Sequence, residues 1–150
     1  MIRKKIMYSY KYPRPAVTTD CVLFSEDANG NLCVLLIQRG DDPFKGYWAF
    51  PGGFLNMDED AETGARRELL EETGLEVGSM DQVGCFSAVD RDPRGRTISI
   101  AFYAFVPMIE AHGGDDAEDA RWFPVQTLPT LAFDHDLMLQ AALKKLREEK

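Results

Sequence analysis

The sequence predicts an α/β (α+β) fold, an α/β/α sandwich in which helices cover both faces of a mixed β-sheet. Apolar and β-branched runs alternate with turn signals along most of the chain, and only two segments have helical periodicity. One helix is expected in the middle of the chain and the other at residues 135–148. A sheet with so few helices buries both faces when one helix packs on each side.

Length and composition predict one globular domain. The chain has 150 residues, of which 45% are hydrophobic and 28% charged, and this length is enough for a sizeable core. Residues 1–14 are expected to form an irregular arm, and residues 15–150 a single domain. No apolar run approaches the ~18 residues that a membrane span needs.

The first two strands are expected to form a hairpin. Residues 16–24 are rich in β-formers, Asn29-Gly30 is a turn signal, and residues 32–38 suit a strand buried on both faces. Cys21 and Cys33 lie in these runs and are expected in the core.

The rest of the chain is expected to alternate loops and strands. Residues 39–48 are predicted as a loop, and the following AFPGGF as backbone turns. Residues 110–119 are predicted as an acidic loop. Three further strands are expected within 80–89, at 97–106 and at 120–125. Trp48 and Trp122 are expected in the core.

The middle helix is expected to begin near residues 57–60, where Asn56 and Glu59 resemble a capping box, and to end at Gly74. Gly64 inside it is expected to pack closely against the sheet. Three positions recur every four residues and should face the core, namely Ala61, Ala65 and Leu69.

The last helix, 135–148, is expected to be capped by Asp134. Its apolar stripe should comprise Leu139, Leu143 and Leu146.

Negative charge gathers on one side of the middle helix, at Glu68, Glu71 and Glu72. Like charges at this spacing repel by a few tenths of a kcal/mol per pair, and a solvated acidic face is the simpler interpretation. However, Pro51-Gly52-Gly53 lies directly upstream and could expose carbonyl oxygens nearby. Carboxylates and a carbonyl form a hard-oxygen site suited to Mg²⁺, which completes its coordination with substrate phosphates.

The spacing around this cluster carries a resemblance. Gly53 is followed after five residues by Glu59, and after seven more by Arg67-Glu68-Leu69-Leu70-Glu71-Glu72-Thr73-Gly74-Leu75. This pattern resembles the Nudix box at every defined position. The resemblance implies an α/β/α sandwich with a catalytic loop-helix-loop. It also implies hydrolysis, with Mg²⁺ or Mn²⁺, of a nucleoside diphosphate linked to another moiety.

The same resemblance implies roles for the box residues. Glu68 and Glu72 would be direct metal ligands, with the carbonyl of Gly53 nearby, and Glu71 would bind a second ion or its water. Arg67 would orient a box carboxylate through a bidentate pair. Glu59 would help to hold the box together.

Four segments outside the box resemble the ADP-ribose pyrophosphatase branch of the family. They are residues 38–54, 91–102, 114–123 and 131–135. That branch includes the Nudix domains of ADP-ribose-sensing transcriptional regulators, which carry a DNA-binding domain after the Nudix domain. No such domain is expected within these 150 residues.

Several residues of these segments are candidates for substrate binding. Arg39 could pair with phosphate or form a surface ion pair. Three arginines, Arg91, Arg94 and Arg96, crowd one loop, and one or two of them could contact phosphate or ribose. The substrate-binding set is predicted to be Arg39, Phe44, Arg91, Arg94 and Phe133, with either phenylalanine stacking on adenine or packing internally.

A general base must reach the attacking water. In the family it is often a carboxylate on a late loop, which here gives Asp115, Asp116 and Glu118, but Glu71 is an alternative. His135 is expected to be structural or close to the substrate rather than a metal ligand.

The predicted function is metal-dependent hydrolysis of ADP-ribose to AMP and ribose 5-phosphate. The alternatives are an oxidised nucleotide or another nucleotide sugar as substrate, or a catalytically silent ADP-ribose sensor. The net charge of −8 disfavours nucleic acid as a partner, and a small-molecule nucleotide is expected instead. The protein is also expected to be cytoplasmic and to have no membrane partner, and a homodimer is a possible assembly.

Overall fold

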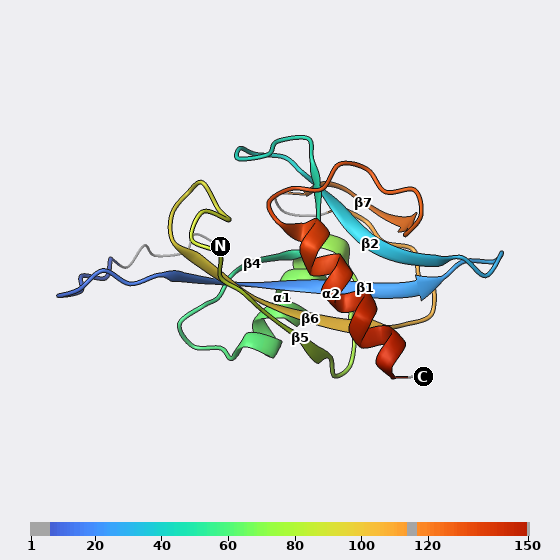
Figure 1. Cartoon of the computed structure of the whole chain (residues 1–150), viewed down its shortest axis with the longest axis horizontal. Coiled ribbons are helices and arrows are strands. Elements are labelled where there is room, and N and C mark those ends of the chain that lie inside the picture. The colour runs from blue at the N-terminus through green and yellow to red at the C-terminus, as the bar shows by residue number, and fades with distance from the viewer. Residues whose placement is uncertain (1–6, 114–116, 150) are drawn as a thin grey trace.

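The computed structural model describes residues 7–113 and 117–149 (Figure 1). It contains seven strands and two helices in this part of the chain. Their bounds are β1 Ala16–Glu26, β2 Leu32–Arg39, β3 Trp48–Ala49, β4 Gly52–Phe54, α1 Ala61–Thr73, β5 Asp81–Phe86, β6 Thr97–Phe105, β7 Ala117–Pro124 and α2 His135–Glu148.

The strands form one mixed sheet with β1 at its centre. The main order is β3-β2-β1-β6-β5, while β4 also pairs with β1 and β7 with β2. β1 and β2 form the predicted antiparallel hairpin, with Phe24 opposite Val34. β1 and β6 are parallel from Ala16 opposite Thr97 onward. The long connection between β1 and β6 contains β2, β3, β4, α1 and β5.

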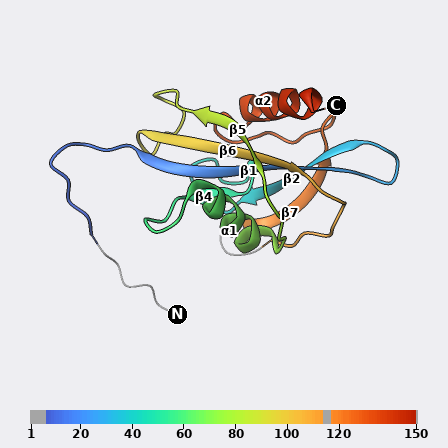
Figure 2. The same cartoon turned by 90° about the horizontal axis from the view of Figure 1, so that it is seen from below.

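The two helices lie on opposite faces of the sheet, which confirms the predicted sandwich (Figure 2). Alternate residues of β1 face opposite sides. Cys21 and Leu23 belong to the core on the α1 side, with Ala65 and Leu69. Val22 and Phe24 belong to the core on the α2 side, with the predicted stripe of Leu139, Leu143 and Leu146.

The residue that ends α1 was predicted, but the residue that caps its start was not. Gly74 ends the helix as predicted, with a left-handed φ of 77°. The capping box prediction was wrong, because the N-cap is Asp60, whose carboxylate accepts from the Thr63 N–H at 2.9 Å. Asn56 does donate its N–H to the Glu59 carboxylate at 2.9 Å, but it lies before the turn that leads into the helix.

The prediction that Gly64 packs against the sheet was also wrong. A Cβ at Gly64 would lie 2.7 Å from Cδ1 of Leu55 and 3.0 Å from a carboxylate oxygen of Glu59. Gly64 therefore packs against the loop that precedes α1.

Three local differences separate the observed strands from the predicted ones. β3 and β4 occur where a loop and turns were expected, because β2 and β1 provide pairing edges for Trp48–Ala49 and Gly52–Phe54. β7 begins at Ala117, inside the predicted acidic loop, because it continues alongside β2 as far as Arg39.

Cys21 and Cys33 are buried as predicted, and both tryptophans pack against core clusters.

In the part of the chain that the structure describes, no helix is long and apolar enough to cross a membrane.

Gly74→Ala should lower the free energy of unfolding by about 1 kcal/mol, because a side chain is unfavourable at a left-handed φ. Nothing lies within 4 Å of the added Cβ, so strain alone would cause the loss. Urea denaturation measures it. Gly78→Ala is the matched control, since its Cβ also meets nothing within 4 Å and no left-handed φ applies there. Equal stability of the two variants would contradict the assignment.

Candidate functional site

One cavity of about 760 Å³ lies where α1, β4 and the start of α2 meet. It collects residues from distant parts of the sequence, and its charged lining falls into two groups. The acidic members are Asp20, Asp41, Asp42, Glu68, Glu71, Glu72 and Asp92. The basic members are Arg39, Arg67, Arg91 and Arg94.

The most buried carboxylate of the α1 group is Glu72, whose exposed fraction is 8%. Its Oε1 accepts from the Gly52 N–H at 2.8 Å, which ties the helix to β4. Burial, with further contributions from Glu68 and Asp20, raises the pKa of Glu72 to about 8. Burial also raises the pKa of Glu68, while Arg67 opposes that rise. The site thus concentrates negative charge where water stabilises it poorly.

Arg67 holds the carboxylates in place. Its Nε and Nη2 form a bidentate pair with Glu59, at 2.9 and 2.7 Å. Its Nη1 donates to Glu68 at 2.8 Å and to Glu71 at 3.1 Å. These hydrogen bonds raise the pKa of Arg67. One guanidinium therefore joins three box carboxylates, in the bidentate geometry that arginine favours.

The backbone at Gly53 lies close to the Glu68 side chain. A Cβ on Gly53 would lie 2.7 Å from the carboxyl carbon of Glu68. The Gly53 backbone therefore runs directly against that carboxylate.

The oxygen donors at this site are chemically suited to a hard divalent cation. Glu68, Glu71, Glu72 and the Gly53 carbonyl are oxygen donors of the kind that Mg²⁺ and Mn²⁺ prefer, and burial raises the pKa of Glu68 and Glu72, with neighbouring carboxylates adding to the rise. Within residues 7–113 and 117–149, however, no three His, Cys, Asp or Glu side chains converge as a ready-made metal site. Arg67 engages Glu68 and Glu71 instead, so these side chains would turn to hold an ion.

Arg39 and Arg94 form another part of the cavity lining. Both guanidinium groups lie over the Phe133 ring, at 5.0 and 5.4 Å from its centroid, and Arg94 also lies 4.8 Å from the Phe54 ring. Arg39 donates to the Pro43 carbonyl at 2.8 Å. Burial, followed by the Arg94 charge, lowers the pKa of Arg39. Positive charge is thus crowded in this part of the lining, as negative charge is at α1.

Two further residues predicted to bind substrate have other contacts. Arg91 borders the cavity, but its side chain is 3% exposed and forms a bidentate pair with Asp134 at 2.7 and 2.9 Å. This pairing also explains why the Asp134 carboxylate makes no capping hydrogen bond to α2. Phe44 is absent from the cavity lining and packs on Phe133 with ring centroids 4.7 Å apart. Arg96 donates to the Ser87 carbonyl, outside the cavity.

The structure leaves the late-loop candidates for the general base open. Asp115 and Asp116 lie outside the described residues, and Glu118 belongs to the start of β7 without a described side chain. Glu71 lines the cavity with a side chain that is 37% exposed.

Sequence reasoning missed two buried carboxylates, Asp20 and Asp92. Asp20 lies on β1, 6% exposed, and accepts a short hydrogen bond from the Ser99 hydroxyl. Asp92 is buried and binds Arg94 through both oxygens, the shortest contact being 2.8 Å. A single aspartate within the apolar run AVTTDCVLF was the available signal for Asp20, because an aspartate is rarely buried without a partner.

The NUDIX domain family model matches residues 14–142. This chain belongs to the Nudix family.

Two relatives align with more than nine-tenths of this Nudix chain. It is 40% identical to the ADP-ribose pyrophosphatase of Methanocaldococcus jannaschii over 141 residues, which cover 93% of this chain and 80% of the relative. It is 36% identical to the ADPR responsive transcriptional repressor NtrR of Acinetobacter baylyi over 144 residues, 92% of this chain. The match spans only 57% of that repressor's length.

Solved structures share the fold. The NUDIX domain of Shewanella oneidensis NrtR in complex with ADP ribose is 30% identical, with a TM-score of 0.86 and coverage of 93% of this chain and 94% of that one. A bifunctional NMN adenylyltransferase/ADP ribose pyrophosphatase from Francisella tularensis, in complex with AMP and a Mn ion, is 28% identical with a TM-score of 0.80. The alignment covers 91% of this chain and 43% of that enzyme.

Glu72→Gln should change how the stability of the metal-free protein depends on pH. The folded-state pKa of Glu72 is about 8 against an ordinary 4.5, so between these values the folded chain keeps a proton that the unfolded chain has lost. The free energy of unfolding then falls as pH rises through this window. In the glutamine variant that fall should be smaller by on the order of 1–4 kcal/mol. Urea denaturation with EDTA at about pH 5 and about pH 8.5 measures the difference.

Glu76→Gln is the matched control, since this glutamate lies exposed just beyond α1. The control should keep the wild-type dependence on pH. An unchanged dependence in Glu72→Gln would show that Glu72 is ionised in the fold at neutral pH.

Proposed function

We propose that this Nudix chain is a divalent-metal-dependent pyrophosphohydrolase that cleaves ADP-ribose to AMP and ribose 5-phosphate. The observation that carries the proposal is that one cavity is lined both by the α1 carboxylates, here called the acidic wall, and by Arg39 and Arg94, the basic wall. A pyrophosphate between the walls would face arginine on one side and cations held by carboxylates on the other. The 40% identity to an ADP-ribose pyrophosphatase and the fold shared with an ADP ribose complex support the substrate.

The proposed metal ligands are Glu68 and Glu72, the Gly53 carbonyl, and Glu71 for a second ion or its water. The cation is Mg²⁺, with Mn²⁺ as an alternative, supported by the Mn ion in the Francisella enzyme. When bound, such ions polarise phosphoryl oxygens and lower the pKa of a coordinated water. Arg67 would continue to restrain Glu59 as the carboxylates of Glu68 and Glu71 turn.

The basic wall would bind and orient the substrate. Arg39 and Arg94 are restrained by Pro43 and Asp92, so little conformational entropy would be lost when they pair with phosphate. The Phe133 ring, which both guanidinium groups approach, would supply an apolar surface for a ribose or a base. Arg91, being paired with Asp134, would instead fix the wall's shape.

The reaction consumes one water. Its oxygen would attack one phosphorus of the diphosphate, the bond from that phosphorus to the bridging oxygen would break, and the bridging oxygen would leave with the other phosphoryl group. The water proton would pass to a carboxylate, for which we propose Glu71, Asp115, Asp116 or Glu118. Single substitutions of these four to the amide, with kcat compared at saturating substrate, identify the base by the largest fall.

One observation favours a second candidate function. The repressor NtrR is 36% identical over 92% of this chain, so an ADP-ribose sensor without turnover is the competing proposal. The complete set of box carboxylates around Arg67 favours catalysis, because sensing alone requires no such concentration of negative charge.

Hydrolysis of ADP-ribose, NADH, nucleotide sugars and oxidised dGTP with Mg²⁺ tests the proposal. AMP and ribose 5-phosphate should form from ADP-ribose faster than products form from the other compounds. Preference for a triphosphate would remove the substrate assignment. Binding of ADP-ribose without turnover would favour the sensor.

Arg39→Gln should lower kcat/KM for ADP-ribose by on the order of 10–100-fold, because a charge-assisted contact to phosphate is lost. Arg96→Gln is the matched control, since that guanidinium contacts the Ser87 carbonyl outside the cavity. It should stay within about twofold of the wild type. Equal losses in the two variants would indicate a general charge effect instead of a contact at Arg39.

A further inference from the structure

The backbone that faces the α1 carboxylates is held at three successive residues. Phe50 donates its N–H to Nδ1 of His135 at 3.1 Å. The Pro51 carbonyl accepts from the Cys21 N–H at 2.8 Å. Gly52 donates to Glu72 at 2.8 Å. The Pro51 contact is made by backbone alone, so the side chains that hold this segment in the described chain are His135 and Glu72.

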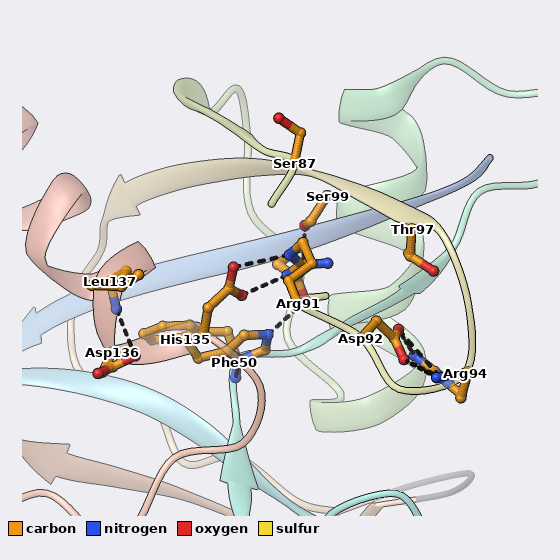
Figure 3. Close-up of polar contacts among 12 residues, drawn as sticks. Phe50, Ser87, Arg91, Asp92, Arg94, Thr97, Ser99, His135, Asp136 and Leu137 are labelled. Carbon is orange, nitrogen blue, oxygen red and sulfur yellow. Dashed lines mark hydrogen bonds and ion pairs between the residues drawn. The ribbon is translucent and has the colours of Figure 1, made fainter. Parts of the chain in front are cut away.

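His135 brings the far end of the sequence to this segment. It is the first residue of α2, 85 residues beyond Phe50, and its side chain is 4% exposed. The imidazole stacks on the Phe50 ring with centroids 5.5 Å apart and an interplanar angle of 21°. Figure 3 shows the two rings side by side, with Arg91 close by.

The other ring nitrogen faces Asp20. Because Nδ1 accepts a hydrogen bond, the proton of the neutral ring lies on Nε2, which is 3.8 Å from Oδ1 of Asp20. Asp20 is opposite Gly52 in the pairing of β1 and β4, and Ser99 donates to its other oxygen. The ring is therefore held from one side by the Phe50 hydrogen bond, and from the other by the electrostatic attraction of its Nε2–H to the Asp20 carboxylate, which at 3.8 Å lies too far for a direct hydrogen bond.

We propose that His135 is a positioning residue that sets the Gly52–Gly53 backbone against the α1 carboxylates, with Asp20 orienting its imidazole. An apolar side chain of similar size would fill the same space but would leave the Phe50 N–H without its acceptor. The segment would then shift where the Gly53 backbone lies close to the Glu68 carboxylate. The expected change in kcat rests on the proposed hydrolase function. The expected change at the Phe50 amide rests only on its hydrogen bond to His135.

The start of α2 is anchored by Asp134, the residue before His135, and this anchoring suits a positioning role for His135. Asp134 directs its carboxylate to Arg91 at 2.7 Å instead of capping the helix. The residue next to His135 is thus anchored to the loop that also carries Arg94, so one connected set of contacts places both walls of the cavity.

His135→Leu compared with His135→Asn tests the proposal, since the Asn oxygen can accept from Phe50 as Nδ1 does. The leucine variant should lose 10–100-fold in kcat with KM for ADP-ribose within about twofold, and should require more Mg²⁺ for half-maximal rate. Its Phe50 amide should exchange hydrogen at least tenfold faster. The asparagine variant should recover most of both losses. Leu137→Ala, on the exposed side of α2, is the control and should change neither readout.

Amide exchange separates this inference from the proposed function. A wild type that hydrolyses no nucleotide would remove the function, while faster exchange at Phe50 in the leucine variant alone would still support the positioning role. Wild-type exchange in His135→Leu, or equal kinetic losses in the leucine and asparagine variants, would overturn it. If His135→Leu does not fold, Asp20→Asn replaces it, with a smaller loss of kcat and faster Phe50 exchange expected. Wild-type values for both would again overturn the proposal.

Discussion

Negative charge held away from water at α1 is the constraint on which the rest of the site depends. Glu68 and Glu72 lie in a setting that disfavours their ionised forms, and like charges repel more strongly as the surrounding dielectric falls. Arg67 offsets part of this repulsion by joining Glu59, Glu68 and Glu71. The Gly52 N–H offsets another part at Glu72. The geometry of β4 and of the loop before α1 follows from these two requirements.

Each wall of the cavity brings like charges together, arginines on one and carboxylates on the other. Arg39 and Arg94 share one aromatic ring as their common neighbour, while the glutamates share one guanidinium. Arg39 and Glu72 attract each other, but each group also keeps partners of its own, Pro43 and Asp92 on one side and Gly52 on the other. An anion chelated by cations would relieve both repulsions together. Local destabilisation of this kind is characteristic of functional sites.

What the sequence could predict follows from the range of the interactions involved. The sandwich, the hairpin, the end of α1 at Gly74 and the stripe of α2 depend on periodicity and turn chemistry, which are local. The start of α1 near residues 57–60 was predicted, but its cap was not, because Asn56 and Asp60 both suit a cap and only the observed turn before the helix distinguishes them. The strands β3 and β4 are too short to show a pattern and exist because longer neighbours offer a pairing edge.

Long-range pairing limited the prediction of the site in the same way. Arg91 and Arg94 look equivalent in the sequence, yet one pairs with Asp134, 43 residues away, and the other with Asp92, two residues away. Asp20 and His135 carry no motif, and their relation to Phe50 exists only in the folded chain. The spacing of the box, by contrast, lies on one helix and the loop before it, and the cavity contains all three of its clustered glutamates.

The parallel pairing of β1 with β6 also has a consequence for how the chain acquires its structure. Asp20 meets Ser99 across 79 residues, and Phe50 meets His135 across 85. Contacts this remote in sequence close late, since loop-closure entropy must be overcome before they form. A chain emerging from the ribosome would therefore complete α1 long before the sheet that organises it. The glutamates would remain hydrated side chains during synthesis and acquire their altered acidity only when the sheet forms against α1 and buries them.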